Sequence, residues 1–153
     1  MTVVKIMGRN TSAFIHNYIH SLEEKNIEET LSYFTDDATW IIPQNKIKGK
    51  KEIEGYVLWL FENIKELTFI NDGIGVMAHG NKAIYQNILK ATIKNDNVRI
   101  PTMFIFRLKE NKFSKQWIIN NWFEYTQTIP FNTHTDEVGN IIQIGWNRDY
   151  SNL

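Results

Sequence analysis

The sequence predicts one α+β domain in which three helices precede a long antiparallel sheet. Apolar residues recur at helical spacing up to about residue 64. Beyond residue 67, stretches that alternate between apolar and polar residues are separated by short turns containing Gly and Asn, which is typical of β-hairpins. The 153 residues match the length of a single domain, and the 42% hydrophobic content suffices for a packed core.

The helices are placed by their capping residues and apolar stripes. Asn, Thr and Ser occupy residues 10–12 and are favoured at helix N-caps, so the first helix is expected over about 11–25. Asn26 is expected to cap a short second helix over 27–34, and a third helix is expected over 50–64. Each helix should pack one apolar face on the sheet.

The remaining elements are strands joined by turns. They are expected at 38–42, 67–79, 82–94, 99–108 and 113–127, the last four as consecutive hairpins. The domain is therefore expected over 11–128, after an N-terminal extension of 1–10. The segment 129–153 has no clear periodicity and is interpreted as a tail or small hairpin.

Composition excludes several classes of protein. The 17 basic and 17 acidic residues balance, which argues against nucleic-acid binding. The chain has no cysteine, so disulfides and thiolate chemistry are excluded. No apolar run is long enough to span a bilayer, and the first residues do not resemble a signal peptide. A cytoplasmic protein is therefore expected, without membrane association.

The second face of the predicted sheet remains apolar where solvent exposure would favour polar residues. Such a patch often marks an interface, and we expect a homodimer through this outer face; scattered surface hydrophobes are the alternative. The residues assigned to it are Ile84, Ile88, Met103, Ile105, Ile118 and Trp122, with Asn120 and Glu124 beside them.

Two amides fall on the helix-facing side by strand alternation, namely Asn87 and Asn121. A buried amide without a partner costs about 1–3 kcal/mol. These side chains either bond to one another, to backbone or to water, or they line a cavity that receives a polar ligand atom. The sequence leaves both possibilities open.

The order of elements and three segments carry a family resemblance. These segments are "YIHSLEEKNIEETLSYFTDDATWIIP", Gly49 with Ile53, and "VMAHGNKAIYQ". Over about 11–128 the chain resembles SnoaL-like and ketosteroid isomerase-like proteins of the NTF2-like, or cystatin-like cone, superfamily. The resemblance implies three helices on a strongly curved, mostly antiparallel sheet that encloses a small-molecule pocket, with no metal or organic cofactor.

The catalytic groups of ketosteroid isomerases are only partly present. The resemblance places Ile42 where those enzymes have the basic aspartate, and Phe104 near their second aspartate. Tyr18 matches the tyrosine of the oxyanion hole. The adjacent acids Asp36 and Asp37 match acids at the helix-to-strand turn of relatives, and we expect them to bind loose backbone N–H groups there rather than act in catalysis.

The candidate site follows from this comparison. Tyr18 is the candidate catalytic residue, as a donor to a ligand carbonyl, although an ordinary core tyrosine is an equal alternative. Trp40 either orients a flat ligand or packs in the core. His16 and His20 have metal-binding spacing but lie off the apolar stripe, so a solvated pair is favoured. The predicted ligand-binding residues are Trp40, Ile42, Tyr56, Asn87, Phe104 and Asn121.

Two functions remain open at this stage. The first is a small-molecule-binding domain, acting as an isomerase, cyclase or hydratase-like enzyme on a hydrophobic ring-containing or polyketide-like ligand. The second is a non-catalytic ligand-binding or dimerisation module, which the missing aspartates favour. The inward amides weigh against a pure scaffold, because a scaffold would fill the interior with hydrophobic side chains.

Overall fold

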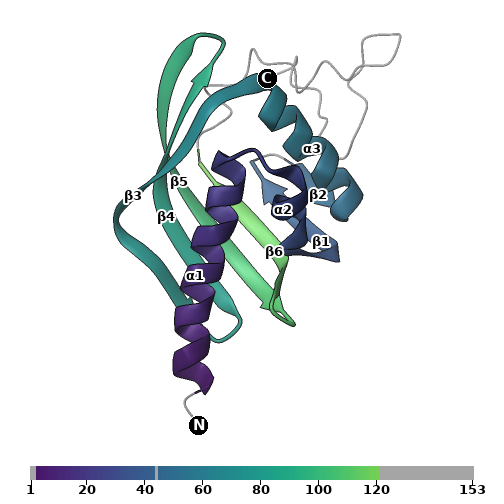
Figure 1. Cartoon of the computed structure of the whole chain (residues 1–153), viewed down its shortest axis with the longest axis vertical. Helices are drawn as coiled ribbons and strands as arrows, with labels where there is room; N and C mark the ends of the chain where they lie inside the picture. Colours follow the sequence, from purple (N-terminus) through teal and green to yellow (C-terminus); the bar gives the residue numbers. More distant parts are fainter. Residues whose placement is uncertain (1–2, 44, 121–153) are drawn as a thin grey trace.

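The computed structural model describes residues 3–43 and 45–120, with side chains from residue 11 onward. This part of the chain forms three helices and six strands, with two helices first and the third helix between the second and third strands (Figure 1). Their bounds are α1 Val3–Glu23, α2 Ile27–Ser32, β1 Phe34–Ile42, β2 Asn45–Lys48, α3 Lys50–Asn63, β3 Ile64–His79, β4 Lys82–Ile93, β5 Asp96–Lys109 and β6 Lys112–Ile119. The predicted α+β class is confirmed.

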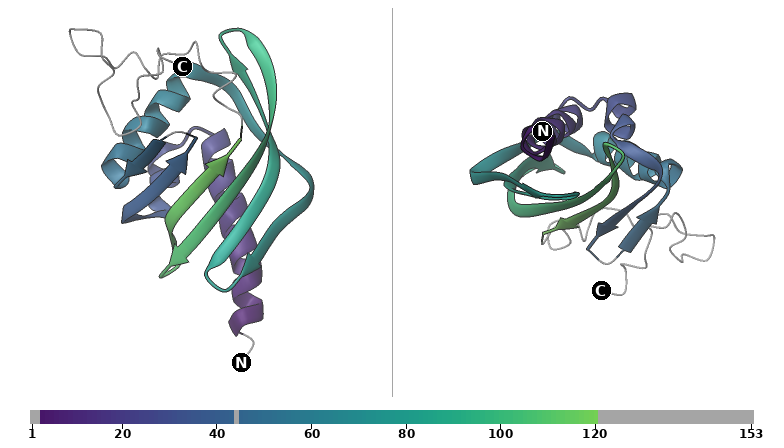
Figure 2. Two further views of the ribbon diagram at one scale, coloured as in Figure 1. Left: turned by 180° about the vertical axis from the view of Figure 1, so that it is seen from behind. Right: turned by 90° about the horizontal axis from the view of Figure 1, so that it is seen from below.

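The strands form one sheet in the order β2-β1-β6-β5-β4-β3. Neighbouring strands are antiparallel except β1 and β6, which are parallel. The sheet curls around the helices, which cover its concave face (Figure 2). Helix α1 packs beside β3, and α3 packs beside β1, so the core lies between these two helices and the curved strands.

The helix ends differ from the sequence prediction. Helix α1 begins at Val3 and continues through the polar residues 10–12, where its start was expected. Asn, Thr and Ser cost only a few tenths of a kcal/mol each inside a helix (about 0.7 kcal/mol at most), so they mark a possible start without enforcing it. The N-cap at Asn26 is confirmed, because its side chain accepts the N–H of Glu29 at 3.0 Å.

Strand β1 is longer than expected, and β2 was missed. Asp36 and Asp37 lie within β1, where its register with β6 shifts, rather than in a turn before it. Strand β2 is a four-residue edge strand in which Ile47 alone is buried. The alternation of Ile47 with two lysines was its only signal, and four residues give too short a pattern to separate from a loop.

Strand β3 continues as one strand through two glycines that were expected to interrupt it. Gly73 and Gly75 have φ values of +103° and +76°, which side chains rarely adopt. The side-chain oxygen of Asn71 accepts the N–H groups of both glycines, at 2.8 and 3.1 Å. This bulge bends the strand before pairing with β4 resumes at Val76.

A bulge of one residue in β6 reverses the predicted facing of that strand. Leu108 pairs with Phe113, but Arg107 pairs with Lys115, so Ser114 is an extra residue. A regular hairpin would have turned Trp117 toward the helices, whereas the bulge turns Gln116 inward instead. The predictions that Ile118 and Asn120 lie on the outer face are therefore wrong, because both residues line the interior cavity.

Candidate functional site

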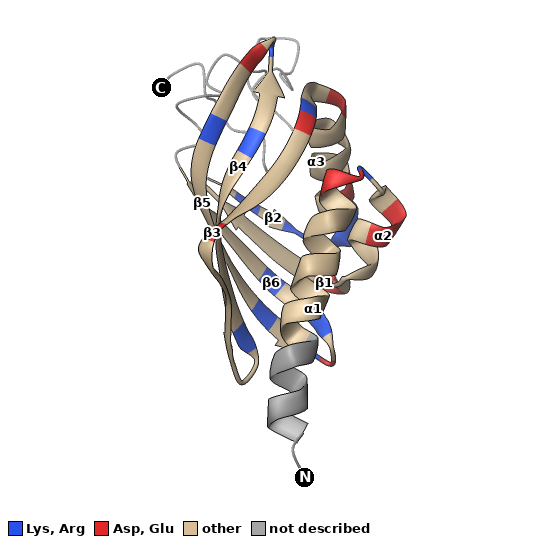
Figure 3. Cartoon of the chain, turned by 60° about the vertical axis from the view of Figure 1, so that its left-hand side comes forward, with Lys and Arg blue, Asp and Glu red and all other residues tan. Residues whose placement is uncertain are grey.

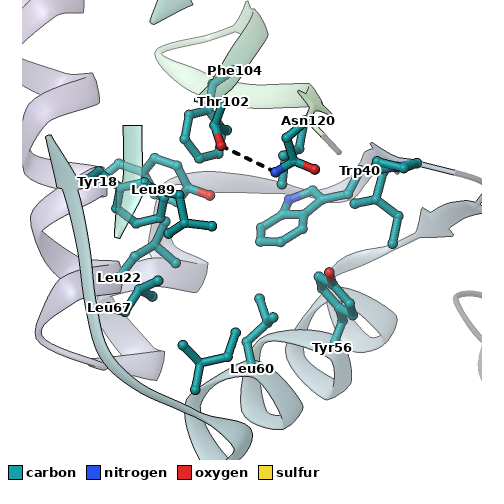
Figure 4. Close-up of a pocket in the computed structure, with 15 residues that line it drawn as sticks. Tyr18, Leu22, Trp40, Tyr56, Leu60, Leu67, Leu89, Thr102, Phe104 and Asn120 are labelled. Carbon is teal, nitrogen blue, oxygen red and sulfur yellow. Dashed lines mark hydrogen bonds between the residues drawn. The ribbon is translucent and has the colours of Figure 1, made fainter. Parts of the chain in front are cut away.

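The interior holds a cavity between the helices and the concave side of the sheet (Figure 4). Its volume is about 60 Å³, and its wall is almost entirely apolar. Since one water needs about 10–15 Å³, the space suits a molecule of only a few non-hydrogen atoms. The lining residues are Tyr18, Leu22, Trp40, Ile42, Pro43, Tyr56, Leu60, Ile64, Leu67, Phe69, Leu89, Thr102, Phe104, Ile118 and Asn120.

Five of the residues predicted from the sequence meet at this cavity. Tyr18 comes from α1, Trp40 and Ile42 from β1, Tyr56 from α3, and Phe104 from β5. They converge because each lies on the apolar, inward side of its own element, and all five are buried.

Of the two predicted amides, the structure describes only Asn87, which does not join this lining. Asn87 is 1% exposed, as the strand pattern predicted, but it is not among the lining residues. Its backbone pairs with Thr102, which does line the cavity, and its side-chain nitrogen donates a long bond of 3.5 Å to the carbonyl of Tyr85. Asn121 lies outside the described residues.

Tyr18 places its hydroxyl on the cavity wall but directs its proton elsewhere. The hydroxyl donates to the side-chain oxygen of Gln116 at 2.7 Å, and both residues are fully buried. Burial raises the pKa of Tyr18 well above its usual value, while the bond to Gln116 lowers it by less. The phenol is therefore neutral at ordinary pH, and its proton is already engaged by the protein.

Two polar residues of the wall were not recognised from the sequence. Thr102 donates to the carbonyl of Ile100 at 3.0 Å and accepts from the amide of Asn120 at 3.3 Å. Thr102 shares the inward face of β5 with Phe104, so strand alternation was sufficient to find it. Asn120 was missed because its facing depends on the bulge at Ser114.

No Asp, Glu, His, Lys or Arg belongs to the described lining of the cavity. Asp36 and Asp37 are exposed and do not cap the backbone as expected: Asp36 lies 3.5 Å from the ammonium of Lys50, and Asp37 accepts from Thr35 at 2.9 Å. His20 is exposed beside Glu23 and Glu24. The side chains that line the cavity therefore supply neutral donors and acceptors.

The outer face, meaning the side of the sheet turned away from the helices, is mixed apolar and basic. Lys82, Arg107 and Lys115 are direct neighbours across three strands, and the cations of Arg107 and Lys115 lie 5.9 and 4.8 Å from the ring centre of Trp117. Figure 3 shows basic residues on the strands, while many acidic residues lie on the helices. The apolar members of this face are Ile84, Ile88, Met103, Ile105, Trp117 and Ile119.

The family model for the SnoaL-like domain matches residues 15–116, most of the described chain. The chain belongs to the SnoaL-like domain family. No curated protein matches the sequence. Among the described residues of this SnoaL-like domain, no helix is long and apolar enough to cross a membrane.

Solved structures resemble the SnoaL-like domain in fold at low identity. A candidate polyketide cyclase from Xanthomonas campestris superposes with a TM-score of 0.69 at 9% sequence identity. The match covers 77% of this chain and 95% of that protein. A candidate SnoaL-like polyketide cyclase from Shewanella putrefaciens gives 0.66 at 11%, covering 74% and 91%. A ketosteroid isomerase-like protein from Catenulispora acidiphila gives 0.63 at 12%, covering 69% and 83%. The predicted NTF2-like cone is confirmed.

Proposed function

We propose that this SnoaL-like domain binds a small, neutral, largely apolar molecule in the cavity described above. The cavity wall carries this proposal, because its described side chains are apolar or neutral and leave space for about one small ring. The relative from Catenulispora acidiphila is in complex with trimethylamine, a comparably small molecule.

A cavity-filling variant tests the proposal. Leu60→Trp adds a large ring to the wall, and we expect it to abolish binding of cyclopentane, measured by saturation-transfer NMR. Leu58→Trp is the matched control, since Leu58 is 40% exposed on the same helix and outside the described lining. Equal signals from the wild type and both variants would contradict binding in the cavity, and so would an absence of signal from the wild type.

Catalysis is a second candidate function, favoured by the likeness to candidate polyketide cyclases. An isomerase, cyclase or hydratase-like reaction would use the Tyr18 hydroxyl to polarise a ligand carbonyl. Its bond to Gln116 would first have to be exchanged for one to the ligand. The absence of acidic and basic groups from the described lining favours the non-catalytic binding role.

We also infer that the outer face joins two copies of the chain. Ile119 is 52% exposed, and Ile105 lies between Ile84 and Trp117 in the centre of the apolar part.

Ile105→Lys should convert a dimer to a monomer in light scattering coupled to size-exclusion chromatography, because it places a charge in the contact. Leu58→Lys, on the helix side, should leave the mass unchanged. A wild-type protein that is monomeric at high concentration would reject this interface.

A further inference from the structure

Trp40, which lines the cavity, carries a hydrogen-bond donor that no group in the described part of the chain uses. The indole nitrogen of Trp40 is buried and has no partner within the described chain, and Trp40 itself is 1% exposed. The hydroxyls of Tyr18 and Thr102, by contrast, donate to Gln116 and to the carbonyl of Ile100. A buried N–H without a partner costs free energy, so such a group in a binding cavity points to a missing acceptor.

The surrounding aromatic rings hold this donor in place. Phe34 and Tyr56 contact the indole, with ring centres 5.4 and 5.9 Å away. Figure 4 shows the indole extending into the space between Asn120 and Tyr56, with its nitrogen on the edge toward Asn120 in that view. A donor fixed in this way loses little conformational freedom when a ligand binds.

A second unused donor lies beside the first. Trp40 on β1 pairs with Gln116 on β6, and both side chains are buried on the concave side of the sheet. Tyr18 occupies the oxygen of the Gln116 amide, and the amide nitrogen has no partner within the described chain. Gln116 lies behind the lining residues, so Trp40 is the wall residue of this pair, and the two N–H groups together favour an electronegative atom nearby.

We propose that the cavity selects ligands that carry a neutral hydrogen-bond acceptor, such as a ketone or ether oxygen. The N–H of Trp40 donates a hydrogen bond to that acceptor. This assignment rests on the proposed binding function and names the class of ligand. A carboxylate is disfavoured, because no Lys, Arg or His in the described lining compensates its burial. Trp40, rather than Tyr18, is then the residue that orients the ligand.

Two probes of nearly equal shape test this selection. Cyclopentanone carries a carbonyl oxygen where methylenecyclopentane carries a CH₂ group. We expect Trp40→Phe to raise the dissociation constant of cyclopentanone, relative to that of methylenecyclopentane, by about two- to tenfold. This factor corresponds to the loss of one neutral hydrogen bond. Trp117→Phe on the outer face is the matched control and should leave the ratio unchanged.

A measurement on the wild-type protein guards against a poorly folded variant. The indole N–H resonance of Trp40 should move downfield when cyclopentanone is added and should not do so with methylenecyclopentane. Binding of both probes with an unchanged ratio, or with the same response of this resonance, would overturn the role of Trp40 and leave the binding function standing. Failure of both probes to bind the wild type would reject both proposals.

Discussion

Tyr18→Phe is expected to lower the free energy of unfolding by about 1–3 kcal/mol, measured by urea denaturation. The change removes one oxygen atom but leaves the buried amide of Gln116 without the donor that now lies 2.7 Å from its oxygen. Water cannot easily replace that donor, because both residues are fully buried. Tyr33→Phe is the control, since its hydroxyl bonds to Glu29 in an exposed position, and a change within about 0.5 kcal/mol is expected there.

A double-mutant cycle separates this bond from the effect of altered packing. Gln116→Leu alone leaves the Tyr18 hydroxyl unpaired, whereas the double variant leaves neither partner unsatisfied. The double variant should therefore be more stable than the sum of the two single changes predicts. Strict additivity would show that the bond between Tyr18 and Gln116 contributes nothing.

The pH dependence of the same variant provides a second test. In the unfolded chain Tyr18 ionises near pH 10, but burial raises its pKa in the folded protein. Unfolding therefore releases a proton above about pH 10, and the stability that Tyr18 provides falls as the pH rises beyond that value. Tyr18→Phe should lose stability less steeply than the wild type in this range, with no difference in slope at neutral pH.

Gly49→Ala is expected to destabilise the protein by about 1–3 kcal/mol, because Gly49 has φ +86° and ψ 150°, a conformation that residues with a Cβ rarely adopt. This conformation connects β2 to α3, since its N–H donates to the carbonyl of Ala38 at 2.8 Å and its carbonyl accepts from Ile53 at 3.0 Å. Beyond the adjoining residues, no atom of the described chain lies within 4 Å of the added methyl group, so backbone strain is the expected cause rather than a clash.

Gly55→Ala provides the matched control on the same helix. Gly55 lies within α3, and beyond its chain neighbours and the backbone of its own helix, the added methyl group meets no described atom within 4 Å. Alanine should therefore stabilise this helix, by about 0.5–1 kcal/mol. Opposite signs in thermal or urea denaturation are expected for the two variants. Equal effects would mean that the backbone at Gly49 relaxes without cost.

The sequence was sufficient to predict the fold and five of the fifteen residues that line the cavity in the described part of the chain. Helical stripes and strand alternation act locally, so Tyr18, Trp40 and Phe104 were assigned to the interior from their own segments. Asn26 was identified as an N-cap for the same reason. These features require no knowledge of how distant strands pair.

The errors at the cavity concern features that depend on pairing between strands. Ile118 and Asn120 were assigned to the outer face because the bulge at Ser114 has no signature in composition. The bond from Tyr18 to Gln116 joins residues 98 positions apart, and no local pattern reveals it. The unused N–H of Trp40 was also beyond the sequence, because recognising it requires the partners of every neighbouring polar group.

Ser114 makes β6 tolerant of a change in length at one position. If that residue were absent, Arg107 would still lie opposite Lys115, and the next pair would still join Leu108 to Phe113. Loss of a residue farther along, at Trp117, would instead exchange interior and exterior positions for the rest of the strand. When relatives of this chain are aligned, a gap belongs at the bulge, since placing it elsewhere would equate cavity residues of one protein with surface residues of another.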